Sequence, residues 1–201
     1  MNKKNIIKIL ILIVLLGVFA YIVKRIISPV STGIIPPVIT GKEELIPVNL
    51  YFASSDESYL LFEERKIYKT ESINDRAKQA IIELIKGPLS ANLSVTIPKG
   101  TYLRELYIDA QKIAYVDFSK ELKEGHPGGT SAEIMTIYSI VTTLLKNFST
   151  DISKAQILIE GNSVDTLVGH LDLTSPLALN NSLIKEPKEI KSPLPPLLKG
   201  D

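Results

Sequence analysis

The stretch GGTSAEIMTIYSIVTTLLKNF, residues 128–148, decides how the rest of this chain can fold. Two glycines lead into it, and apolar residues then recur at intervals of three and four, which predicts an amphipathic helix over 131–148. Thr130 and Glu133 have the spacing of a capping box, in which both side chains bond backbone N–H groups at the helix start. The predicted core face is Ile134, Ile137, Tyr138, Val141, Leu144, Leu145 and Phe148, and the other face is Thr136, Ser139, Thr142, Thr143 and Lys146.

A second amphipathic helix is predicted over 73–86. Ser72 can cap its start, with Asp75 three positions further on. Gly87-Pro88 ends it, because glycine accepts the left-handed conformation and proline cannot continue a helix.

Extended segments surround the two helices. The short connection between 102–108 and 112–118 predicts an antiparallel hairpin, and consecutive aliphatic residues predict that 154–160 is a central strand. The order of elements predicts an α+β fold, a two-layer sandwich in which a mostly antiparallel sheet carries both helices on one face. The remaining predicted extended segments are 47–53, 60–62, 65–68, 164–168 and 169–173.

Residues 6–23 form a long apolar run that only Lys8 interrupts. A membrane-spanning helix needs about 20 apolar residues, so residues 1–27 are predicted to be a transmembrane signal anchor. The alternative is a signal peptide cleaved after Ala20, which would release a secreted protein. Both interpretations place residues 28–201 outside the cytoplasm, and the first makes the membrane a partner.

The rest of the chain divides by composition. Residues 28–46 contain proline and glycine without periodicity and are predicted to be a linker. Residues 47–178 are the predicted folded domain. Residues 179–201 are predicted to be a flexible proline-rich tail.

Charge and cysteine content exclude several classes of protein. Of the 23 basic residues, five precede residue 28, so the remainder carries 18 basic and 22 acidic residues. A mildly acidic body argues against a nucleic-acid partner. The absence of cysteine excludes disulfides, thiolate metal sites and a lipidated cysteine. His126 and His170 lack the spacing of metal ligands, so no metal or cofactor is predicted.

The two glycines before the long helix are the first candidate site. Gly128 and Gly129, followed by free helix N–H groups, can receive a small anion. The alternative is that they only let the loop turn into the helix. No catalytic residue is assigned, and the candidate interaction residues are Gly128, Gly129, Thr130, Ser131, Glu133 and His170.

Two catalytic arrangements can be drawn from the sequence, and each has a structural alternative. His126 can be drawn as a base for Ser131, but Ser131 lacks the surroundings of a nucleophile and is explained as a first-turn residue of the helix. Two carboxylates can act as acid and base on a cell-wall glycan, although the sequence brings no two of them together. The acidic residues concerned are Asp117, Glu121, Glu124, Asp165 and Asp172.

Six groups of residues follow one another in a characteristic order and spacing. They are VNLYF (48–52), ELIKGP (83–88), IPKGT (97–101), AYVDFS (114–119), GTSAE with IYSIVTTL (129–144), and ILIEG with LVGHLD (157–172). This pattern resembles the GerMN domain of sporulation and spore-germination proteins over residues 46–178. The resemblance implies a membrane-anchored or secreted protein whose fold is similar to the ring-building motifs of the sporulation channel. It implies no catalytic residues. The chain departs from tandem, lipidated members because it has one such domain and no cysteine.

The sequence therefore predicts a non-enzymatic, extracytoplasmic domain on a membrane anchor. Its predicted partner is an envelope protein or peptidoglycan, and the resemblance implies a role related to sporulation or germination. A cell-wall hydrolase using acidic loop residues and a small-anion or ligand-binding module at Gly128-Gly129 are the alternatives. Self-association is left open.

Overall fold

The computed structural model describes Leu16 and residues 44–185. The predicted anchor over residues 6–23, nearly all of the linker and residues 186–201 of the tail lie outside this described part. Among the described residues, no helix combines the length and the apolar character that crossing a membrane requires.

The first sheet is built on a long hairpin. β1 (Leu45–Ser54) pairs antiparallel with β2 (Leu60–Tyr68), and β3 (Leu93–Ser94) adds to the end of β1, giving the order β2-β1-β3. β2 is one continuous strand, whereas the sequence predicted two short pieces. Every residue of β2 pairs with β1 without a bulge, so the two predicted segments are parts of a single strand.

The second sheet has the order β4-β5-β6-β7. β4 (Leu103–Ile108) and β5 (Ile113–Phe118) form the predicted antiparallel hairpin, and β6 (Lys154–Ile159) lies parallel to β5. The prediction of a central strand is confirmed, because β6 lies between β5 and β7. Its partner β7 is Asn162–Ser163 rather than 164–168, since the positive φ angles of Glu160 and Gly161 reverse the chain directly after β6.

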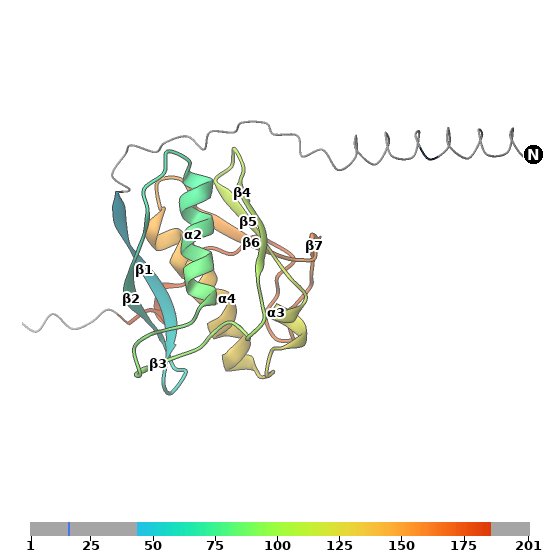
Figure 1. The fold of residues 1–201 in the computed structure, drawn as a ribbon. Coiled ribbons are helices and arrows are strands. Elements are labelled where there is room, and N and C mark those ends of the chain that lie inside the picture. The colour runs from blue at the N-terminus through green and yellow to red at the C-terminus, as the bar shows by residue number, and fades with distance from the viewer. Residues whose placement is uncertain (1–15, 17–43, 186–201) are drawn as a thin grey trace, which may run out of the picture. The chain divides into compact units, whose positions relative to one another are not determined.

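Both predicted helices are present. α2 (Ile73–Ile85) begins as predicted, with the Ser72 hydroxyl accepting from Asp75 N at 3.2 Å. α4 (Thr130–Asn147) lies within one residue of its predicted bounds, and a short helix, α3 (Glu121–Glu124), occupies part of a predicted loop. α2 packs on β1, β2 and β4, α4 packs on β1 and β6, and the helices contact each other (Figure 1).

The α+β class is confirmed, but the single predicted sheet is two sheets with the helices between them. The reason lies in the polar face of α4, which runs along the edge of β1. The Asn147 side chain accepts from Asn49 N at 2.8 Å and donates to Asn49 O at 2.7 Å, and the Thr143 hydroxyl accepts from Tyr51 N at 3.0 Å. Helix side chains thus bond the edge of β1 where a neighbouring strand would have paired, so β1 cannot join the second sheet.

The described chain ends on the outer edge of β2. A 3-10 turn over Asn181–Leu183 leads to Ile184, which pairs parallel with Leu60, and Lys185 N donates to Leu60 O at 3.0 Å. Residues 179–185, which the sequence assigned to the tail, thereby contact the domain.

Candidate functional site

The start of α4 holds most of the predicted interaction residues. Gly129 is its N-cap with φ of 90° and ψ of 147°, and Gly128 has φ of 85°. A Cβ built on either glycine meets no atom within 4 Å, so the backbone angle, and not a close contact, requires glycine here. Thr130 and Ser131 are exposed, and neither side chain caps the helix.

Glu133 does not form the predicted capping box. Its side chain is fully buried, and its carboxylate accepts the N–H groups of Leu167 at 2.8 Å, Val168 at 3.0 Å and His170 at 2.8 Å. The prediction was wrong because the sequence shows only the local N–H groups, while the loop at 167–170 presents closer donors from a distant part of the chain.

The charge of Glu133 is stabilised where it lies. Burial alone would raise the pKa of this carboxyl, but the N–H groups of Val168, His170, Leu167 and Leu171 outweigh burial and lower it. The structure therefore brings Glu133 and His170 together, although only through the backbone of His170, whose ring is exposed. The pair fastens the loop to the helix.

His126 is held by both ring nitrogens. Nδ1 accepts from Gly128 N at 3.0 Å, and Nε2 lies 3.1 Å from the Thr136 hydroxyl, which itself donates to Thr96 O at 2.6 Å. This chain of bonds makes Nε2 the protonated nitrogen of a neutral ring. Burial lowers the pKa of His126, and this is only partly opposed by the backbone carbonyl of Ala132, which favours the protonated ring, and by the charge of Glu133. His126 therefore ties the glycine loop to Thr136 of α4, and it makes no described bond to Ser131.

A cavity of about 190 Å³ lies beside the start of α4. Its wall is mainly apolar, and its charged lining residues are the exposed Glu57 and Lys99. An engineered cavity of about 150 Å³ can hold benzene, so this volume suits a single apolar side chain and not a larger ligand. The apolar lining includes Ala53, Val95, Pro127, Ala132 and Met135.

The acidic residues of the hydrolase alternative each have structural partners or lie apart. The Asp117 carboxylate accepts from Gly161 N at 2.7 Å and from Arg104 at 3.1 Å, and Glu124 forms an ion pair with Lys120. A general acid needs a raised pKa, whereas a bond from Ser119 lowers the pKa of Glu121.

Bonds from Thr174 lower the pKa of Asp172, just as the bond from Ser119 lowers the pKa of Glu121. Asp165 is exposed. Within the described part of the chain, no three acidic or histidine side chains are placed to hold a metal ion.

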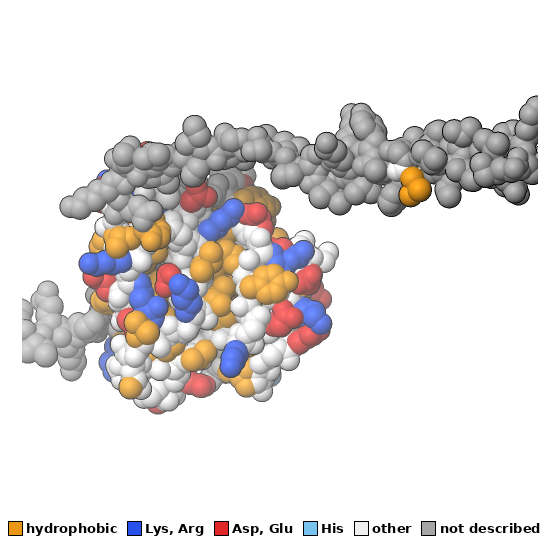
Figure 2. Space-filling view, viewed as in Figure 1, with side chains coloured by type: hydrophobic (Ala, Val, Ile, Leu, Met, Phe, Trp, Pro, Cys, Tyr) orange, Lys and Arg blue, Asp and Glu red, His pale blue; other side chains and the backbone are white. Residues whose placement is uncertain are grey.

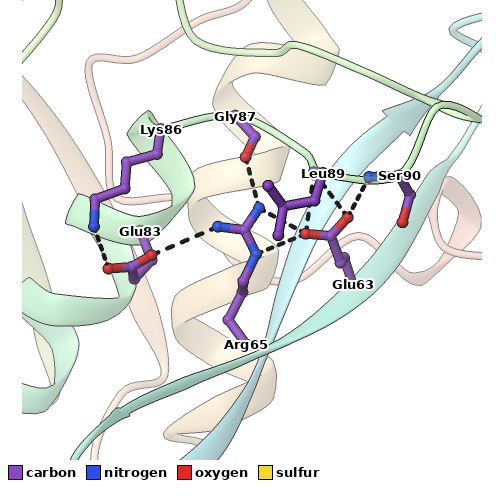
Figure 3. Close-up of polar contacts among 7 residues, drawn as sticks. All are labelled: Glu63, Arg65, Glu83, Lys86, Gly87, Leu89 and Ser90. Carbon is purple, nitrogen blue, oxygen red and sulfur yellow. Dashed lines mark hydrogen bonds and ion pairs between the residues drawn. The ribbon is translucent and has the colours of Figure 1, made fainter.

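Sequence reasoning missed a cluster of charged residues on β2 (Figure 3). The Arg65 guanidinium bonds Glu63 at 2.7 Å and Gly87 O at 2.8 Å, and it lies 3.5 Å from Glu83. The side chains of Glu63 and Arg65 are only 11% and 12% exposed. The signal was the sequence Glu63-Glu64-Arg65-Lys66, which places one acidic and one basic side chain on each side of a strand, because adjacent residues of a strand face opposite sides.

This cluster fixes the chain after α2 against β2. The Glu63 carboxylate accepts from Leu89 N at 3.0 Å and Ser90 N at 2.8 Å. Burial opposes its charge, but the bonds from Ser90, Arg65 and Leu89 prevail and lower the pKa of Glu63. Leu89 is thereby held beside β2 with 81% of its surface exposed.

In the part of the chain that the structure describes, the outer edge of β2 is bonded only at its ends. Leu60 O accepts from Lys185, and the Tyr68 backbone N–H and C=O bond the Gln79 side chain at 2.8 and 3.1 Å. Because alternate residues of a strand face the same way, Phe62, Glu64 and Lys66 also point their backbone groups outward. Among the described residues, these groups have no partner.

Other strand edges are covered more fully. On β4, Leu106 N donates to the Glu105 side chain at 2.9 Å and Ile108 N to Asn74 at 3.0 Å. β6 is flanked by β7 and by Leu177, which exchanges two backbone bonds with Ala155. The face drawn in Figure 2 mixes acidic, basic and apolar side chains, so no single sign of charge dominates it.

Comparison with known proteins agrees with this architecture. The family model described as "Sporulation and spore germination" (Germane) matches residues 49–165. No curated protein matches the sequence.

Two solved structures share the fold. The tandem GerMN domains of the sporulation protein GerM from Bacillus subtilis have 23% identity and a TM-score of 0.55, over 67% of this chain and 46% of that one. The first GerMN domain of GerM alone has 22% identity and a TM-score of 0.54, over 68% of this chain and 98% of that one. This chain thus spans less than half of the tandem structure and nearly all of a single domain. With a family model that matches most of the described domain, the chain belongs to the GerMN (Germane) family of sporulation and spore germination domains.

Proposed function

We propose that this chain is a non-enzymatic interaction domain held at the cell envelope, outside the cytoplasm, by residues 6–23. The open edge of β2 at Phe62, Glu64 and Lys66 is the observation that carries this proposal. An unpaired edge is a template for another extended chain, because its N–H and C=O groups are already aligned for a ladder. The partner is an envelope protein, and peptidoglycan is the alternative ligand.

The roles of the carboxylates support an interaction domain over a hydrolase. Asp117 is held by Arg104 and a backbone N–H, and Glu133 is buried under three N–H donors. A hydrolytic pair would need two carboxylates facing one accessible cleft. These two carboxylates hold loops in place.

Photo-crosslinking in intact membranes tests the proposal. A photoreactive residue at position 64 of the full chain is expected to form a protein adduct, and the same residue at exposed Glu71 is the control. Lys66→Pro should abolish the adduct, because proline removes an outward N–H without breaking a bond to β1, and Lys66→Ala should keep it. Equal adducts at positions 64 and 71, or recovery of glycan alone, would contradict the proposal.

The cavity beside α4 favours a second function, the capture of one apolar side chain of a peptide. N-acetyl-leucinamide is a suitable probe, and the Met135 methyl group in the cavity wall is the reporter in an NMR titration. Ala132→Leu should fill the cavity and remove the response. A response that persists in this variant would place the probe elsewhere.

A further inference from the structure

We propose that the partner of the open β2 edge is the β2 edge of a second copy of this chain, paired antiparallel about a two-fold axis. The inference rests on the proposed function, since it names the occupant of the same edge. It follows from the charges on the strand and from the way its two ends are closed.

The closed ends limit the ladder to a short run. Gln79 occupies the backbone of Tyr68, and Lys185 occupies Leu60 O. Within residues 44–185, only Phe62, Glu64 and Lys66 of this edge remain to bond a neighbour, so few antiparallel registers between two copies are available.

Charge selects one of these registers. Placing Glu64 opposite Lys66 of a second copy makes two pairs of opposite charge, one on each side of the axis. Moving one copy by one pairing step in one direction places Glu64 opposite Glu64 of the second copy. Moving it in the other direction places Lys66 opposite Lys66 of the second copy. Like charges directly opposite each other destabilise a sheet, whereas opposite charges stabilise it.

The side chains that would pair are free to do so. Glu64 and Lys66 are both exposed, and neither forms an ion pair with another described residue. Charged residues on an edge strand usually discourage pairing. Here their opposite signs at alternate positions make the edge complementary to itself, which a run of one sign would not do.

The residue on the axis is the main obstacle, because Arg65 would lie opposite Arg65 of the second copy. The structure already neutralises this side chain. Its guanidinium bonds the Glu63 carboxylate, lies 3.5 Å from Glu83 and donates to Gly87 O (Figure 3). Its charge is therefore compensated within each copy.

The contact is small, with two pairs of residues exchanging backbone bonds, so the association is weak in solution. Attachment of both copies to one membrane raises their effective concentration and favours the pair. Leu89, exposed beside β2, adds apolar surface next to the ladder.

Charge reversal tests the register directly. Glu64→Lys leaves two positive charges on the edge, and Lys66→Glu leaves two negative charges. Each variant of the full chain, reconstituted in liposomes and followed by energy transfer between labelled copies, should associate at least tenfold more weakly than the natural chain. A mixture of the two variants should recover association, because each edge then complements the other, and so should the double variant.

Three results would overturn the inference: no energy transfer for the natural chain, single variants that associate as it does, or a mixture no better than its components. Thermal unfolding of each variant should match that of the natural chain, since both side chains are exposed. If self-association fails while position 64 still crosslinks to another envelope protein in a manner abolished by Lys66→Pro, the second copy is the wrong partner and the interaction domain stands. If both fail, the proposed function falls as well.

Discussion

Replacing Glu133 with glutamine removes one charge from the interior of the domain and changes the side-chain shape very little. The carboxylate accepts three N–H groups, those of Leu167 and Val168 on one oxygen and that of His170 on the other. An amide offers one oxygen, so its NH₂ group must face at least one of these donors. Glu133→Gln therefore leaves a buried N–H without an acceptor and weakens the bonds that remain.

The cost can be worked from these contacts. A buried donor without a partner costs about 1–3 kcal/mol, and bonds to a charged group exceed neutral ones by about 1 kcal/mol each. The lower cost of burying a neutral amide offsets part of this loss. We expect a net loss of about 2–3 kcal/mol in the free energy of unfolding, which lowers Tm by about 10 °C for a domain of this size.

Urea and thermal unfolding measure this loss, with exposed Glu71→Gln as the matched control. Amide exchange at Leu167, Val168 and His170 should also accelerate. The test separates two roles of the same residue, because a capping box accepts glutamine as well as glutamate. A loss below about 0.5 kcal/mol would refute the buried-anchor role and favour the cap.

Three further predictions concern residues in α4 or directly before it. Thr143→Val should lower the free energy of unfolding by about 1–3 kcal/mol, because it removes the acceptor of Tyr51 N. Thr142 is equally buried, but its hydroxyl bonds no described residue, so Thr142→Val should be neutral or stabilising. Equal effects of the two variants in urea unfolding would contradict the bond between Thr143 and the edge of β1. Burial lowers the pKa of His126 below its ordinary value of 6.5, so the unfolded chain binds more protons just below that pH and stability should fall as the solution is acidified; an unchanged slope in His126→Gln would argue against this. Gly129→Ala should cost about 1–3 kcal/mol from backbone strain alone, and calorimetry showing no loss would mean that the loop relaxes to ordinary angles.

Local patterns in the sequence predicted the helices well. The intervals between apolar residues placed α2 and α4 to within a residue, and Ser72 caps α2 as expected. These features depend on neighbours a few positions apart, which a sequence displays directly. The role of Glu133 depends instead on a loop more than thirty residues away, and no local pattern reveals it.

The division into two sheets was missed for a related reason. Periodicity identifies the apolar face of α4, but it does not say that the opposite face is buried too. Thr136, Ser139, Thr142 and Thr143 are all buried. A signal was present, because this face carries small hydroxyl side chains where a solvent-facing helix usually has long charged ones.

That polar face explains where the domain can meet another chain. Thr143 and Asn147 are four residues apart on a helix, a rise of about 6.0 Å, and Asn49 and Tyr51 are two apart on a strand, about 6.6 Å. The near match lets two helix side chains bond alternate outward groups of β1. α4 thus closes the inner edge of the first sheet. Among the described residues, the open backbone groups of this hairpin consequently lie on β2, on the side away from α4, and this is the edge at which we propose that another extended chain pairs.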